Sequence, residues 1–203
     1  MYMVSTSNGL DEHALPHWFG LMTSPRAGNR ASIERGDRPW CMDNDVFTNH
    51  FNPNTFRAAL DKYAPHANTC LFVAAPDVIS DATATLTRWP EWQHEITTRG
   101  YPAALVAQDG LTPDRIPANA DALFIGGSTT WKLSVEAQAL ITAAKARGLW
   151  THVGRVNSQK RIRHFALAGA DSVDGTFHAF ASIPGLLRRL GPALAEEPIW
   201  RGL

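Results

Sequence analysis

A series of short apolar runs in this chain ends, each time, in residues that could do chemistry. The residues that follow successive runs are Asp43 with Asn44, Asp77, Gln108, Gly126 with Gly127, Arg155 with Asn157, and Asp174. Carboxylates can act as nucleophiles or as general acids and bases, and amides can hydrogen-bond a flat polar ligand. Any one of these residues alone is typical of a turn or a helix cap, so the prediction of a site depends on the joint pattern.

The elements that would position these residues alternate between strand and helix patterns. Strands are predicted at 18–22, 40–42, 70–74, 103–106, 122–125, 150–153 and 170–173, and helices at 54–63, 81–98, 134–147, 158–168 and 186–194. Pro90 should break or kink the second of these helices. The alternation indicates a parallel sheet. Because polar residues follow almost every strand, we expect a compact or incomplete TIM-type (β/α) barrel, whose strand ends meet at one rim, rather than a doubly wound sheet.

The composition indicates one α/β domain over residues 1–203, with a loop-rich N-terminal segment at 1–38. The formal net charge of zero argues against a strongly basic, non-specific nucleic-acid coat. Two cysteines and scattered histidines do not form the close ligand cluster of a structural zinc site, so no metal is expected. Neither a signal peptide nor a run of about 18 apolar residues is visible, and we expect a cytoplasmic protein with no membrane contact.

The motifs from about Trp40 to Thr176 resemble those of the tRNA-guanine transglycosylases in the same order. They are more similar to the shorter phage and bacterial relatives that insert 7-deazaguanines into DNA. Residues 42–47 resemble the segment that carries the general acid/base, which the resemblance assigns to Asp43. Residues 169–174 resemble the segment that carries the nucleophile, which the resemblance assigns to Asp174.

The resemblance also implies how the base is recognised. The predicted base-binding residues are Asn44, Asp77, Gln108, Gly126 and Gly127. Side chains of the aspartate and the glutamine can hydrogen-bond the edge of a base. The glycine pair resembles a segment whose backbone amides meet the base, and the absence of side chains there permits close approach.

The departures from the family concern the partner. The family's zinc site of three Cys and one His is missing, as is an RNA-binding appendage, so DNA is expected rather than tRNA. A free nucleobase such as a 7-deazaguanine would be the second substrate of an exchange, and no cofactor is expected. A base in duplex DNA must flip out of the stack before it can react. Arg155, Asn157 and Arg26 are predicted to hold the flanking phosphates.

Three alternatives stay open from the sequence. A hydrolytic DNA glycosylase would excise a modified base and leave an abasic site. A metal-dependent barrel hydrolase would bind Mg²⁺ through Asp43, Asp45, Asp77 and Asp174. A non-catalytic barrel would recognise modified DNA without changing it.

Overall fold

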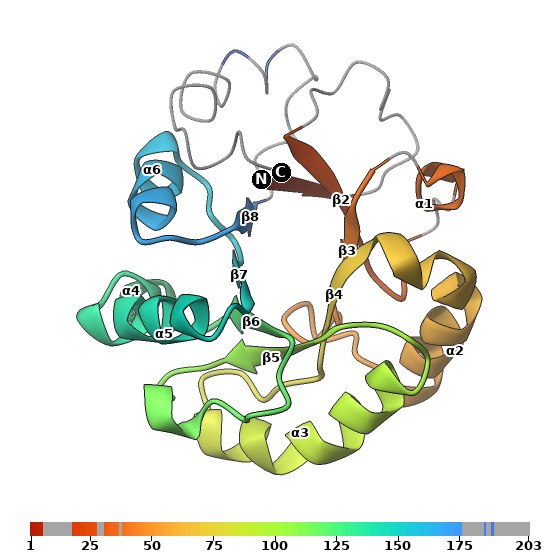
Figure 1. Cartoon of the computed structure of the whole chain (residues 1–203), viewed down its shortest axis with the longest axis horizontal. Helices are drawn as coiled ribbons and strands as arrows, with labels where there is room; N and C mark the ends of the chain where they lie inside the picture. The colour runs from red at the N-terminus through yellow and green to blue at the C-terminus, as the bar shows by residue number, and fades with distance from the viewer. Residues whose placement is uncertain (6–17, 28–30, 37, 176–184, 186–187, 189–203) are drawn as a thin grey trace.

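In the computed structural model, which describes residues 1–5, 18–27, 31–36, 38–175, 185 and 188, eight parallel strands close into a barrel (Figure 1). The strands are β1 (Tyr2–Ser5), β2 (Phe19–Thr23), β3 (Trp40–Met42), β4 (Cys70–Ala74), β5 (Ala103–Ala107), β6 (Ala122–Ile125), β7 (Trp150–Val153) and β8 (Ser172–Asp174). Each strand pairs with the next, and β1 also pairs with β8. All C-terminal strand ends therefore lie at one end of the barrel.

Helices surround the strands (Figure 1). They are α1 (Ala31–Arg35), α2 (Pro53–Tyr63), α3 (Ala82–Thr97), α4 (Thr129–Lys132), α5 (Val135–Ala146) and α6 (Gln159–Leu167), with 3₁₀ turns at Ala64–Thr69 and Pro113–Arg115. Ser134 and Ser158 cap α5 and α6, because their side chains accept hydrogen bonds from first-turn N–H groups. Gly148 and Gly169 follow these two helices with positive φ angles, a conformation that glycine adopts without strain.

The core has two layers, one inside the barrel and one between the strands and the helices. Inside the barrel, the His152 ring lies 5.2 Å from Phe72 and 4.6 Å from Phe124. Outside it, Trp89 and Trp92 of α3 are buried. Strands that are covered on both faces need apolar residues at nearly every position, which explains the continuous apolar runs in the sequence.

The structure confirms the predicted barrel and corrects several details. The barrel is closed, not incomplete, because β1 fills the gap between β8 and β2. Neither β1 nor α1, both within the segment 1–38, was predicted from the sequence. The helix α3 runs through Pro90 without a break, because one missing backbone bond is offset by the burial of the adjacent tryptophans. The last predicted strand is shifted to Ser172–Asp174. The predicted helix at 186–194 lies outside the described residues.

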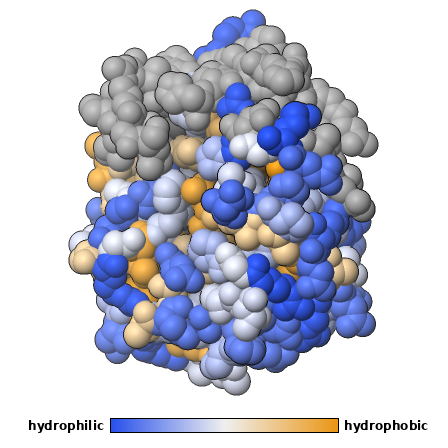
Figure 2. Space-filling model, turned by 45° about the vertical axis from the view of Figure 1, so that its right-hand side comes forward, coloured by the Kyte–Doolittle hydropathy of each residue, from blue (hydrophilic) through white to orange (hydrophobic). Residues whose placement is uncertain are grey.

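Figure 2 shows one face of the molecule, where hydrophilic residues predominate and hydrophobic residues form small patches between them. In the described part of the chain, no helix combines the length and the apolar character that crossing a membrane requires.

Candidate active site

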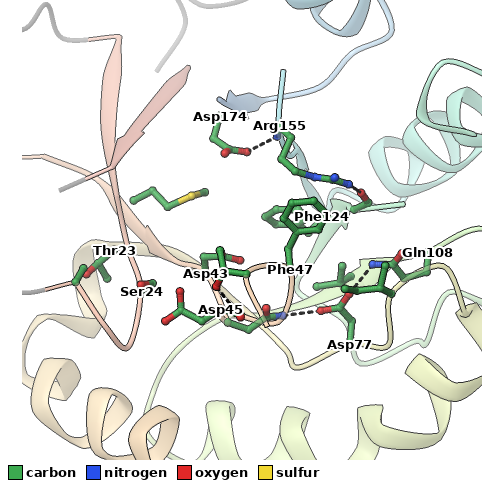
Figure 3. Close-up of a pocket in the computed structure, with 17 residues that line it drawn as sticks. Thr23, Ser24, Asp43, Asp45, Phe47, Asp77, Gln108, Phe124, Arg155 and Asp174 are labelled. Carbon is green, nitrogen blue, oxygen red and sulfur yellow. Dashed lines mark hydrogen bonds between the residues drawn. The ribbon is translucent and has the colours of Figure 1, made fainter. Parts of the chain in front are cut away.

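A pocket of about 360 Å³ opens at the C-terminal end of the barrel (Figure 3). This volume lies in the range of roughly 300–1,000 Å³ that is usual for small-molecule sites. Its lining includes six of the residues predicted from the strand ends, namely Asp43, Asn44, Asp77, Gln108, Gly126 and Asp174, together with Arg155. Residues from six different strand ends therefore meet in one pocket, as the sequence pattern predicted.

Asp43 follows β3 and contributes a carboxyl group to the pocket. Burial, and secondarily the neighbouring carboxylate of Asp174, raises the pKa of Asp43 from its ordinary value of 3.8 to about 7. A hydrogen bond from the backbone N–H of Asn44 partly opposes this rise. A carboxyl group with such a pKa exchanges protons at neutral pH, which is the property of a general acid/base.

Asp174 ends β8 and faces the same pocket (Figure 3). Its Oδ1 accepts a hydrogen bond from the backbone N–H of Arg155 at 3.0 Å and contacts the Nε2 of His152 at 3.1 Å. Arg155 adopts the left-handed conformation (φ 59°), which a non-glycine residue rarely adopts and which brings this N–H to the carboxylate. The structure thus orients Asp174 from two sides.

Asp77 and Gln108 lie at another side of the pocket (Figure 3), where they form a buried hydrogen-bonded group with Asn44. The Asn44 amide donates to Asp77 Oδ1 at 2.8 Å, and the Gln108 amide donates to Asp77 Oδ2. The backbone N–H of Ser80 donates to Gln108 Oε1 at 2.8 Å, which fixes the direction of the amide. The carboxylate of Asp77 also accepts from its own backbone N–H. Within the described residues, the second N–H of Gln108 and the remaining lone-pair capacity of the Asp77 carboxylate are available to a ligand in the pocket.

Asn44 does not have the role that was expected for it, which was to contact the base. Its two amide hydrogens are donated to Asp77 and to the carbonyl of Ala75 at 2.9 Å, and its Oδ1 accepts from the N–H of Val46 at 2.9 Å. An asparagine amide has only two hydrogens to donate. Asn44 therefore orients Asp77 and has no donor left for a base.

The glycine pair after β6 also differs from the expectation. The N–H groups of Gly126 and Gly127 both donate to the carbonyl of Ala107, at 2.9 and 3.1 Å, so the expected amide contacts to a base are already used. Their carbonyl oxygens both accept from the Arg155 guanidinium at 2.6 Å. The need for glycine here is steric: a Cβ on Gly127 would lie 2.3 Å from the Trp131 ring.

Arg155 lies in the pocket wall instead of reaching outward. Its guanidinium lies 3.8 Å from the centroid of the Phe47 ring, and Phe47 is 56% exposed at the pocket mouth. A cation over an aromatic face stabilises the position of both side chains. Phe47 therefore offers a fixed flat surface beside the polar groups.

The two other predicted phosphate contacts, Arg26 and Asn157, are exposed and are not part of the pocket lining. The backbone N–H of Arg26 donates to Asp45 at 3.2 Å, which places Arg26 beside the pocket. Among the described residues, no three His, Cys, Asp or Glu side chains come together in a way that could hold a metal ion.

Phe47 and His152 are residues of the site that were not predicted from the sequence. Phe47 ends the segment 42–47, but nothing in the sequence shows that Arg155 covers its ring. His152 lies within an apolar strand, two positions before Gly154, and therefore on the same face of the strand as that residue. A polar residue at this spacing signals a side chain that points into the barrel below the site.

Comparisons with known proteins support the fold alone. The sequence matches no protein-family model, and no curated protein matches it. A solved structure described as native KDPGal is similar with a TM-score of 0.56 at 11% identity, covering 97% of this chain and 94% of that one. A phosphoribosyl anthranilate isomerase from Thermus thermophilus is similar with a TM-score of 0.51 at 15% identity, covering 87% of each chain. At these identities, shared architecture carries no activity with it.

Proposed function

We propose that this protein breaks and remakes the N-glycosidic bond between a nucleobase and deoxyribose in DNA, exchanging a guanine-type base for a 7-deazaguanine. The observation that carries the proposal is a pair of carboxyl groups in one pocket, one of which can hold a proton while the other is fixed by hydrogen-bond donors. Asp43 holds a proton near neutral pH, whereas Asp174 is oriented by donors. Glycosidic-bond enzymes use an acid and a carboxylate in this way.

The first half of the reaction breaks the bond to the resident base. The carboxylate of Asp174 attacks the anomeric carbon, a C–O bond forms, and the C–N bond breaks. The electron pair of the C–N bond goes to the base nitrogen, which takes the proton from Asp43. The product is a sugar ester on Asp174, a free base and an ionised Asp43.

The second half reverses these steps with another acceptor. An incoming base gives its N–H proton to Asp43 as its nitrogen attacks the anomeric carbon, and Asp174 leaves as a carboxylate. Water could take the same place and would leave an abasic sugar. Exchange therefore requires that the incoming base outcompete water in the pocket.

The Asp77–Gln108 pair supports a guanine-type base. Its carboxylate can accept from the ring N–H and the exocyclic amine of guanine, and the free N–H of Gln108 can donate to the carbonyl oxygen. A 7-deazaguanine presents the same edge. The Phe47 ring, held by Arg155, provides a stacking surface for the base plane.

A product assay tests the proposal. The protein is incubated with duplex DNA, with and without a free 7-deazaguanine, and the DNA is digested to nucleosides for mass spectrometry. A deazaguanine deoxynucleoside would support exchange. Abasic sites and released base would instead show that the protein hydrolyses the bond and does not exchange the base. The absence of any product with duplex DNA, single-stranded DNA and tRNA would overturn the proposal and favour the binding module.

A further inference from the structure

A chain of hydrogen-bonded polar side chains, buried at His152 and Ser172 and partly buried at its two ends, leads to Asp174. Trp150 and His152 lie two positions apart on β7, and Ser172 and Asp174 lie two positions apart on β8, so the two members of each pair share a face of their strand. The strand register pairs His152 with Ser172. The indole N–H of Trp150 donates to Ser172 Oγ at 2.9 Å. Ser172 Oγ lies 2.8 Å from His152 Nδ1, and His152 Nε2 lies 3.1 Å from Asp174 Oδ1.

The protonation of His152 follows from these partners. His152 is fully buried, and burial lowers the pKa of its imidazole, so the ring is neutral and carries one N–H. The Trp150 indole can only donate, so Ser172 accepts from it, and the Ser172 hydrogen is available for His152 Nδ1. In the other tautomer, with its hydrogen on Nδ1, the lone pair of Nε2 would face the carboxylate of Asp174, and the two would repel each other. The ring therefore carries its hydrogen on Nε2 and donates it to Asp174.

This arrangement makes the two oxygens of Asp174 different. In the part of the chain that the structure describes, both hydrogen bonds to Asp174 end on Oδ1, one from His152 and one from the Arg155 backbone. A hydrogen bond to a charged acceptor is among the stronger kinds and fixes the carboxylate plane. The oxygen Oδ2 is left for the pocket.

We infer that His152 is a positioning residue for the proposed reaction: its Nε2–H holds Asp174 Oδ1, so that Oδ2 is the atom that attacks the anomeric carbon. The inference rests on the proposed function. The Trp150–Ser172 pair acts one step further back, because the Ser172 hydroxyl can donate to the bare Nδ1 of this tautomer. Neither His152 nor Ser172 needs to contact the substrate.

Two substitutions of His152 separate a positioning role from simple filling of the core. His152→Gln keeps an N–H donor at a similar reach, whereas His152→Leu fills the space without a donor. We expect His152→Leu to lower kcat by roughly 10–100-fold, the usual effect of losing an outer-shell hydrogen bond, with KM changed less than about twofold. His152→Gln should recover most of this loss. His94→Leu, on the exposed face of α3, is the matched control and should behave as the wild type.

A second measurement does not depend on activity or on the stability of a variant. In ¹⁵N-histidine-labelled wild-type protein, the nitrogen resonances of His152 should show a protonated Nε2 and a bare Nδ1. The His152→Gln spectrum, in which one ring is missing, assigns the signal. An Nδ1–H tautomer, an imidazolium, or a His152→Leu variant as fast as the wild type would overturn this inference alone. A wild-type protein with no turnover on any substrate would instead overturn the proposed function, and this role with it.

Discussion

The substitution Asp43→Asn should remove activity and stabilise the fold at the same time. Asp43 is held in a pocket that opposes its ionisation, through burial and through the charge of Asp174. An asparagine keeps the shape and can still accept from the Asn44 backbone N–H, but it carries no charge to bury. A catalytic residue that destabilises the fold is expected to show both effects when it is replaced: activity is lost and stability rises.

The magnitude follows from the two pKa values of Asp43. The folded pKa of about 7 exceeds the ordinary value of 3.8, so the folded protein binds this proton more tightly than the unfolded chain does. The contribution of Asp43 to the free energy of unfolding therefore falls as the pH rises from about 4 to about 7. Above that pH, the destabilisation of the folded protein by ionised Asp43 is constant. At about 1.4 kcal/mol per pKa unit, the limit is about 4 kcal/mol.

Urea unfolding of both proteins at about pH 5 and about pH 8 measures this effect. The Asp43→Asn protein should be more stable by about 4 kcal/mol at the higher pH, and more than half of that difference should disappear at the lower pH. The difference between the proteins cancels the titration of all other groups. A pH-independent difference, or a variant that is less stable at the higher pH, would refute the assignment of a raised pKa to Asp43.

Three further predictions concern other pocket residues. Asp174→Asn should lower turnover by at least about 10³-fold while the protein remains folded, and near-wild-type turnover would remove Asp174 from its role. Asp77→Ala should weaken discrimination between guanine-type bases and adenine by about tenfold or more in competition assays, since a base edge loses its acceptors; an unchanged preference would place recognition elsewhere. Gly126→Ala should raise KM for the free base, because its Cβ would lie 2.6 Å from Val106 Cγ1 and 3.0 Å from Gln108 Nε2; an unchanged KM would show that this wall does not touch the base.

The sequence was a good guide to the barrel because buried parallel strands and capped helices leave local signals. The strands β3 to β7 and the helices α5 and α6 lie within one residue of their predicted limits at most ends, and Ser134 and Ser158 cap their helices as expected. The strand β1 was missed because the strand-helix alternation that predicted most of the other strands is visible only from residue 39 onward. Closure of the barrel is a property of the whole chain and leaves no local signal.

The site was predicted as a set of positions, but less well as a set of roles. Strand-end spacing identified Asp43, Asp77 and Asp174, since the barrel brings every strand end to one rim. It could not show that the amide hydrogens of Asn44 are used within the protein or that Arg155 turns into the pocket. Such roles depend on which donors and acceptors meet in space, and the sequence does not record those partners.

The most direct test of the account is to look for the covalent intermediate that it requires. DNA with a labelled strand is incubated with wild-type protein, then denatured and separated by size, and any adduct is digested for peptide mass spectrometry. We predict a denaturant-resistant protein–DNA adduct on Asp174, depleted when free base is added and absent from Asp174→Asn. Product formation without an adduct, or an adduct on another residue, would contradict the claim that Asp174 attacks the sugar.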